Sequence, residues 1–94
     1  MRLAIKITSD FKKDLKRATR RGKDKNKMLE IVSLITAGEP LPVKAKDHLL
    51  CDSKYYKNDR ECHVEPDWLL VYCCDYKTQE LLLIRTGSHS DLFK

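Results

Sequence analysis

The stretch Trp68-Leu-Leu-Val-Tyr-Cys-Cys-Asp-Tyr-Lys-Thr-Gln-Glu-Leu-Leu-Leu-Ile-Arg-Thr86 decides the fold that the sequence predicts. Residues 68–74 are apolar at every position, which is typical of a central strand covered on both faces. The polar residues 75–79 predict a hairpin loop, and residues 80–86 predict a second strand that pairs with the first. Gly87 and Ser88 end that strand, and we expect the short tail 89–93 to be helical.

Two further features precede this hairpin. Residues 60–64 predict a short strand, and Glu65-Pro66-Asp67 predicts a turn, because proline fixes its own φ and restricts the residue before it. The segment 43–58 is polar and irregular, and we interpret it as a loop that carries His48.

The N-terminal residues predict one strand and one helix. Leu3, Ile5 and Ile7 alternate with less apolar residues, which predicts a strand with one buried face. We expect Ser9 to cap the following helix. The buried stripe of this helix is expected at three positions spaced i, i+4 and i+7, and Gly22 is expected to end it. The stripe consists of Phe11, Leu15 and Ala18.

A second helix is predicted to begin near Asp24 and to end before Gly38, Pro40 and Pro42. Its apolar face consists of Met28, Ile31, Val32 and Ile35. The order is thus strand, two helices and three strands. This order predicts a single α+β domain over residues 1–94, with a helical hairpin packed on one face of a twisted antiparallel sheet.

The charge of the chain is unevenly distributed. The formal net charge is +5, but residues 1–27 hold 11 Lys/Arg against 3 Asp. Such a basic half indicates a polyanion or an acidic protein as partner, and it fits a solvated helix face equally well. Lys12, Lys16 and Arg20 are the candidate contacts to a nucleic acid. Neither a signal-peptide core nor a membrane-spanning run is present, so we expect a cytoplasmic protein without membrane contact.

The four cysteines, Cys51, Cys62, Cys73 and Cys74, contain no C-x-x-C pair. Cys73 and Cys74 are adjacent on a predicted strand, so their side chains point to opposite faces. We therefore expect four reduced thiols and no metal site.

The three histidines, His48, His63 and His89, are candidate proton carriers because each lies at the edge of a predicted element. The alternative for each is a surface or hydrogen-bonding histidine. Asp67 follows His63 by four residues across the turn. Its carboxylate is expected to orient an imidazole, to act as an acid or base itself, or to cap the turn.

Arg85 falls on the same strand face as Leu81 and Leu83 if the alternation is regular. A bidentate phosphate contact would explain an arginine there, and the alternative is a salt bridge to Glu61, Glu65 or Asp67. Trp68 and Phe93 are candidates for stacking on a base, with ordinary packing as the alternative.

Three stretches carry a family resemblance: Asp47-His-Leu49, Arg60-Glu-Cys-His-Val-Glu-Pro-Asp-Trp-Leu-Leu-Val-Tyr72 and Arg85-Thr-Gly-Ser-His-Ser-Asp-Leu-Phe93. Together with the lysine-rich first helix, they resemble the YafQ branch of the RelE toxin superfamily. The resemblance implies a small RelE-like domain and a bacterial type II toxin. Such a toxin cleaves mRNA on the ribosome and is neutralised by a cognate antitoxin in a hetero-oligomer.

The resemblance also implies roles for single residues. It gives catalytic roles to His48, His63, Asp67 and His89, and it places Arg85 at the scissile phosphate. It gives supporting roles to Trp68 and Phe93. The implied chemistry needs no metal or other cofactor, because the ribose 2′-OH attacks the adjacent phosphate with acid–base assistance.

Two other readings remain open. A ParE-like toxin directed at DNA gyrase has the same scaffold, but it would not need three histidines around a phosphate. A non-catalytic module that binds an antitoxin or RNA is favoured by the segment between His48 and His63, which lacks the family's glycine and has tyrosine in place of tryptophan.

Overall fold

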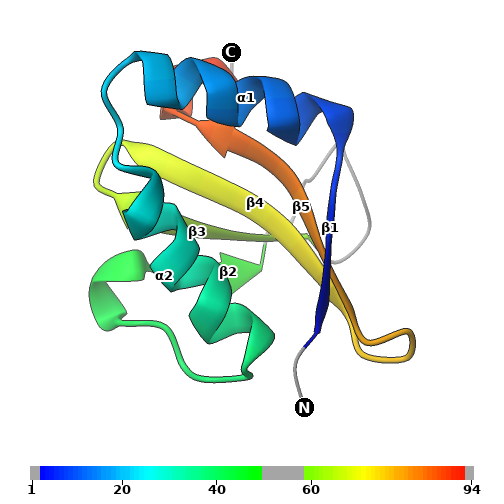
Figure 1. The fold of residues 1–94 in the computed structure, drawn as a ribbon. Helices are drawn as coiled ribbons and strands as arrows, with labels where there is room; N and C mark the ends of the chain where they lie inside the picture. Colours follow the sequence, from blue (N-terminus) through cyan, green and yellow to red (C-terminus); the bar gives the residue numbers. More distant parts are fainter. Residues whose placement is uncertain (1–2, 50–58, 93–94) are drawn as a thin grey trace.

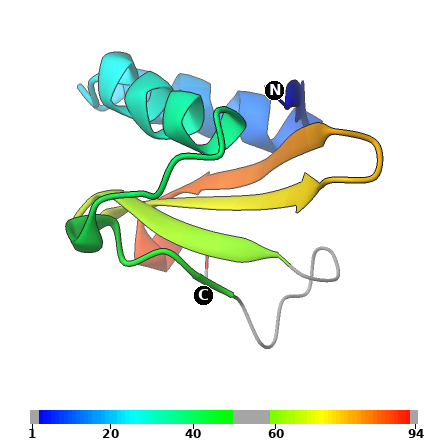
Figure 2. The same ribbon diagram turned by 90° about the horizontal axis from the view of Figure 1, so that it is seen from below.

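The computed structural model describes residues 3–49 and 59–92, which form one five-stranded sheet with two helices on one face (Figures 1 and 2). The strand order is β1-β5-β4-β3-β2. The elements in chain order are β1 (Ala4–Ile7), α1 (Ser9–Arg20), α2 (Lys25–Thr36), a 3-10 turn (Val43–Ala45), β2 (His48–Leu49), β3 (Arg60–Glu65), β4 (Trp68–Asp75), β5 (Glu80–Gly87) and α3 (His89–Leu92).

The hairpin of β4 and β5 forms the centre of the sheet, as the sequence predicts, and the α+β class is confirmed. The sheet is mixed rather than wholly antiparallel, because β1 pairs with β5 in parallel. The chain leaves β1, passes through both helices and the rest of the sheet, and returns to it as β5 (Figure 1). A connection of this length permits a parallel neighbour, whereas a tight hairpin imposes an antiparallel one.

The expectation that Leu3, Ile5 and Ile7 form one buried face is wrong for two of these three residues. Leu3 packs against the core, but Ile5 and Ile7 are about half exposed. The reason is the position of β1 at the edge of the sheet, where a strand has a neighbour on one side only. Alternation in the sequence identifies a strand, but it does not say how much of it the rest of the fold covers.

Both main helices begin at side-chain caps. Asp24 caps α2 as expected, and its side chain accepts from the Asn26 N–H at 2.9 Å. The cap of α1 is Thr8 rather than Ser9. The Thr8 hydroxyl oxygen accepts from the Phe11 N–H at 3.0 Å, while the hydroxyl donates to the Ile84 carbonyl at 2.7 Å. This second bond ties the start of α1 to β5, which Ser9 does not do.

Apolar residues cover both faces of the sheet. Between the helices and the sheet, the expected apolar faces of α1 and α2 pack on Trp68, Leu70, Tyr72, Leu81 and Leu83. The opposite face, called the open face below, carries a smaller cluster in which α3 covers part of β4 and β5 (Figure 2). That cluster consists of Leu69, Val71, Ile84 and Leu92.

Among the described residues, no helix is long and apolar enough to cross a membrane. In the part of the chain that the structure describes, Cys62, Cys73 and Cys74 form no disulfide; Cys51 lies outside that part. Burial raises the pKa of the Cys62 thiol to about 12. At neutral pH the sulfur of Cys62 is therefore protonated, and it behaves as a small apolar side chain.

Candidate functional site

The strand register places two of the predicted site residues in one row across the open face. His48 on β2 pairs with Glu61 on β3, Glu61 with Val71 on β4, and Val71 with Arg85 on β5. Directly paired residues project to the same side of a sheet, so His48, Glu61 and Val71 lie side by side on the open face. The backbone of Arg85 continues this row on β5, and its guanidinium contacts Asp14 of α1. Because strands are about 4.8 Å apart, the row spans roughly 14 Å between the backbones of His48 and Arg85.

The next row along the strands contains His63, Leu69 and Gly87. His63 is two residues from Glu61 and therefore shares its face. Gly87 has no side chain, and α3 begins two residues later with His89. The open face thus has β2 and β3, the strands that carry His48 and His63, on one side and α3 on the other. Figure 2 shows the strands and α3 in this arrangement.

His48 lies in the short strand β2, not in a loop as expected. Its Nδ1 is 2.7 Å from the Lys46 carbonyl, and its Nε2 is 3.5 Å from the Glu61 carboxylate. A carbonyl oxygen can only accept, so this contact requires a hydrogen on Nδ1. The imidazole is oriented by these two contacts, and the ring remains exposed at the end of the row.

Glu61 is a site residue that the sequence analysis did not propose as functional. It is 5% exposed, although carboxylates are seldom so deeply buried. A signal for it was present, since Glu61 precedes His63 by two residues on a strand and must share its face. Its place beside His48 allows it to stabilise a protonated imidazole.

A hydrogen-bond network of Tyr72, Asp47 and Arg60, in which only Tyr72 is buried, holds the residue before His48 in place. The Tyr72 hydroxyl donates to the Asp47 carboxylate at 2.6 Å, and Arg60 Nη2 donates to it at 3.1 Å. Burial and this hydrogen bond raise the pKa of Tyr72, and the same carboxylate raises the pKa of Arg60. Asp47, the residue before His48, is therefore anchored to strands β3 and β4.

His63 and Asp67 lie on either side of the β3–β4 turn. His63 Nδ1 is 3.2 Å from the Pro66 carbonyl, so the backbone of the turn orients this ring. Asp67 is exposed and lies at the rim of a cavity. This cavity is at the end of the sheet, on the side that the helices cover. Its carboxylate is thus accessible at the edge of the site.

Arg85 is not on the face of Leu81 and Leu83, because a β-bulge interrupts the alternation. The register passes from Tyr72–Leu83 to Val71–Arg85, and Ile84 is the extra residue. A bulge adds one residue to a strand and so reverses the side to which later side chains project. Regular alternation gives the wrong face for Arg85 for this reason.

The guanidinium of Arg85 is held by Asp14 of α1, which is 4% exposed. Arg85 Nε and Nη2 donate to the two Asp14 oxygens at 2.5 and 3.2 Å. The Thr86 N–H also donates to Asp14, at 3.2 Å. Thr86 lies beyond Leu83, the last residue of β5 that pairs with β1. The salt-bridge alternative is realised, but with Asp14 instead of Glu61, Glu65 or Asp67.

Trp68 is 1% exposed, so its ring is packed in the core and is not open to a stacking base. Its Nε1–H donates to the Thr86 hydroxyl at 2.9 Å, and that hydroxyl donates to the Leu69 carbonyl at 2.7 Å. The packing alternative therefore applies to Trp68. Phe93 lies outside the described residues.

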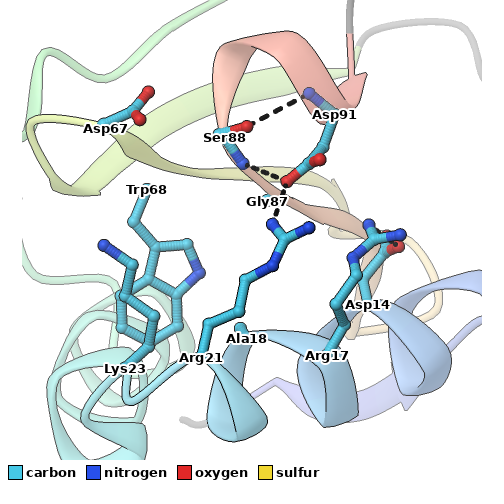
Figure 3. A pocket seen from close by; sticks show the side chains of 10 residues that line it. All are labelled: Asp14, Arg17, Ala18, Arg21, Lys23, Asp67, Trp68, Gly87, Ser88 and Asp91. Carbon is cyan, nitrogen blue, oxygen red and sulfur yellow. Dashed lines mark hydrogen bonds and ion pairs between the residues drawn. The ribbon is translucent and has the colours of Figure 1, made fainter.

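His89 is the first residue of α3, whose predicted helical conformation is confirmed. Beside α3, a cavity of about 250 Å³ separates the end of α1 from the end of the sheet (Figure 3). The cavity is lined by Asp14, Arg17, Ala18, Arg21, Lys23, Asp67, Trp68, Gly87, Ser88 and Asp91.

The candidate RNA contacts Lys12, Lys16 and Arg20 are exposed on α1. Within residues 3–49 and 59–92, no three His, Cys, Asp or Glu side chains are grouped so that they could hold a metal ion. The arrangement offers imidazoles and carboxylates for proton transfer and a guanidinium for an anion.

Comparison with known proteins identifies the family. Residues 3–94 match the family model described as "Bacterial toxin of type II toxin-antitoxin system, YafQ". The chain is 43% identical to the mRNA interferase toxin YafQ of Escherichia coli over 91 residues, covering 95% of this chain and 94% of the relative.

Two solved structures have the same fold. A metal-bound toxin from Helicobacter pylori superposes with a TM-score of 0.91 at 41% identity, over 97% of this chain and 99% of that one. The toxin of the E. coli DinJ–YafQ complex superposes with a TM-score of 0.88 at 38% identity, over the whole of both chains. This chain therefore belongs to the YafQ family of bacterial toxins from type II toxin–antitoxin systems.

Proposed function

We propose that this chain is an mRNA endoribonuclease that cleaves translated mRNA on the ribosome and so blocks protein synthesis in the cytoplasm. Family membership supports the class of activity, since the curated relative is an mRNA interferase. The observation that carries the proposal for this chain is the row across β2, β3, β4 and β5 that contains His48, Glu61 and Arg85, with His63 in the adjacent row.

The reaction that suits this row is a transesterification within the RNA. The ribose 2′-oxygen bonds to the adjacent phosphorus and loses its proton to a base. The bond from phosphorus to the 5′-oxygen breaks, and an acid protonates that oxygen. The products are a 2′,3′-cyclic phosphate and a 5′-hydroxyl, so no oxidant or cofactor is required.

The site provides groups for each part of this reaction. His48, His63, His89 and Asp67 are the candidate acids and bases, and Glu61 supports the imidazolium of His48. Arg85 offsets the charge that develops on the phosphate. Asp14 fixes two nitrogens of this guanidinium, which reduces the reorganisation needed when the phosphate arrives.

The exposed cations of α1 serve as contacts to ribosomal or messenger RNA in this proposal. The chain is also proposed to form a hetero-oligomer with a cognate antitoxin, as the E. coli relative does with DinJ. Co-expression with the neighbouring gene of the operon, followed by size-exclusion chromatography, tests that partner. A neighbour that neither co-elutes nor restores growth would contradict it.

Cell-free translation with mapping of the mRNA ends tests the activity. We expect the wild-type chain to cut mRNA in the presence of ribosomes and to leave 2′,3′-cyclic phosphate ends. His63→Ala and His89→Ala should lower the cleavage rate at least tenfold, in line with the usual contribution of one proton-transfer group, about 10² to 10⁴. Ser90→Ala, an exposed neighbour of His89 in α3, is the matched control. Equal cleavage by all four proteins would refute the catalytic assignment.

A further inference from the structure

Helix α3 carries His89 but has only four residues. Isolated helices shorter than about 12–15 residues are marginal in water, so α3 depends on contacts with the rest of the protein. We propose that Asp91, together with Ser88 and Arg21, forms a clamp that fixes α3 and so positions His89 at the open face. The proposal rests on the proposed function, because it affects catalysis only if His89 takes part in cleavage.

The first part of the clamp lies at the start of α3. The Ser88 N–H donates to Asp91 Oδ2 at 3.0 Å, and the Asp91 N–H donates to the Ser88 hydroxyl at 3.1 Å. This reciprocal pair is a capping box, with aspartate in the place usually taken by glutamate. His89 lies between the two partners, so the box fixes its backbone.

Gly87 allows the Asp91 carboxylate to approach so closely. A Cβ at position 87 would lie 3.1 Å from both Asp91 Cβ and Asp91 Oδ2, which is tighter than normal van der Waals contact. The absence of a side chain at Gly87 and the carboxylate at Asp91 are therefore two parts of one arrangement at the end of β5.

The second part of the clamp ties α3 to α1. Arg21 Nη1 lies 3.0 Å from Asp91 Oδ2, and Figure 3 shows the guanidinium reaching across the cavity to this oxygen. Asp14, Ala18 and the C-cap residue Arg21 follow one another at i, i+4 and i+7, so they lie along one face of α1 and its C-terminal end. This face of α1 holds Arg85 through Asp14, and it holds α3 through Arg21. The positions of Arg85 and His89 are thus both set by one helix.

The cations around the cavity admit a different reading, namely a site for an RNA phosphate. Each of them already faces a carboxylate. Arg17 lies 3.0 Å from Asp14, and Lys23 lies 3.7 Å from Glu65, just as Arg21 is paired with Asp91. The cavity lining also holds three carboxylates, Asp14, Asp67 and Asp91, against these three cations, so the geometry favours a structural clamp over an anion site.

The test measures cleavage of mRNA on programmed ribosomes by the purified full-length chain. Asp91→Ala removes the capping box and the ion pair, and Asp91→Asn removes the charge. Asp91→Glu restores the usual capping-box residue and can still reach Arg21. Glu30→Gln, an exposed carboxylate on α2, is the matched control for charge. Arg21→Ala and the double variant with Asp91→Ala complete a cycle.

We expect Asp91→Ala to lower kcat at least tenfold while KM changes less than about twofold, because a small displacement of a reacting group costs rate rather than binding. Asp91→Glu should recover most of kcat, and the effects of Asp91→Ala and Arg21→Ala should not add. In NMR spectra of histidine-labelled protein, the His89 signals should move in Asp91→Ala and stay in place in Glu30→Gln.

Two outcomes would overturn the clamp. Wild-type kcat and unchanged His89 signals in Asp91→Ala would show that α3 needs no such support. A lower KM in Asp91→Ala with a higher, salt-dependent KM in Arg21→Ala would identify an RNA phosphate site instead. Loss of the proposed function is recognised separately, because His89→Ala would then cleave normally while the NMR comparison still reports on the clamp.

Discussion

Replacement of Asp14 by asparagine is expected to cost about 2–4 kcal/mol of folding free energy. Each Asp14 oxygen accepts two donors: Oδ1 accepts from Arg17 and Arg85, and Oδ2 accepts from Arg85 and the Thr86 N–H. An asparagine amide has one oxygen. Whichever way it is turned, its NH₂ faces two donors and leaves them without an acceptor.

The magnitude follows from burial. Breaking a buried ion pair by removing one partner costs about 3–5 kcal/mol. The side chains of Arg85 and Arg17 are 21% and 40% exposed, so water can replace part of the lost contacts and lower that cost. A domain of this size is stable by about 5–14 kcal/mol, so Asp14→Asn should still fold. Its Tm should fall by roughly 10–25 °C.

Urea unfolding followed by tryptophan fluorescence measures this change directly. Trp68 is the only tryptophan in the chain and is buried, so its emission reports on the core. Asp10→Asn is the matched control, since Asp10 is exposed in the first turn of the same helix and contributes only about 0.3–1 kcal/mol through the helix dipole. If Asp14→Asn cost no more than Asp10→Asn, the view of Asp14 as a buried anchor for Arg85 would be refuted.

Three further predictions concern other groups. Thr86→Val leaves the buried Trp68 Nε1–H without an acceptor and should cost about 1–3 kcal/mol in urea unfolding; a cost near zero would contradict the importance of that hydrogen bond. Hydrogen bonds from Ser88 lower the pKa of Asp91 from 3.8 to about 2. The ionised Asp91 carboxylate therefore stabilises the folded state fully above pH 4, and this contribution is lost as the pH falls toward 2. Asp91→Asn should therefore be less stable than wild type at pH 6, and the gap should close at pH 2; a gap independent of pH would disprove this linkage. Cys62, whose thiol pKa is raised to about 12, should react with a thiol reagent at pH 8 only after urea unfolds the chain, and rapid labelling of folded protein at this position would show that the strand opens.

Local patterns predict most of the elements because local forces specify them. The apolar run from Trp68 to Cys74 and the spacing of Met28, Ile31, Val32 and Ile35 each report burial within one element. Side-chain alternation at a period of 2.0 or 3.6 is sufficient for such predictions. The helices, the central hairpin and the helical tail were predictable for this reason.

Long-range pairing was not predictable in the same way. The parallel register of β1 with β5 depends on residues about 76 positions apart. The bulge at Ile84 reverses the face of Arg85, and no residue type in the strand marks it. Asp14 did leave a signal, since it lies three residues after Phe11 and four before Ala18, on the apolar stripe of a helix whose outer face is otherwise basic.

We propose two functions for the basic half of the chain, which its net charge alone does not separate. Five of its described cations lie within ion-pair distance of carboxylates, namely Lys6, Arg17, Arg21, Lys23 and Lys27. Lys12, Lys16 and Arg20 are exposed on α1. The first group holds helices, sheet and tail together, so its removal should lower stability and change kcat. The second group should contribute to the salt dependence of ribosome binding, with a slope that falls by about one for each phosphate contact removed. If the proposed RNA contacts hold, helix α1 anchors the site on one face and offers charge to RNA on the other, so each face should be alterable without the other.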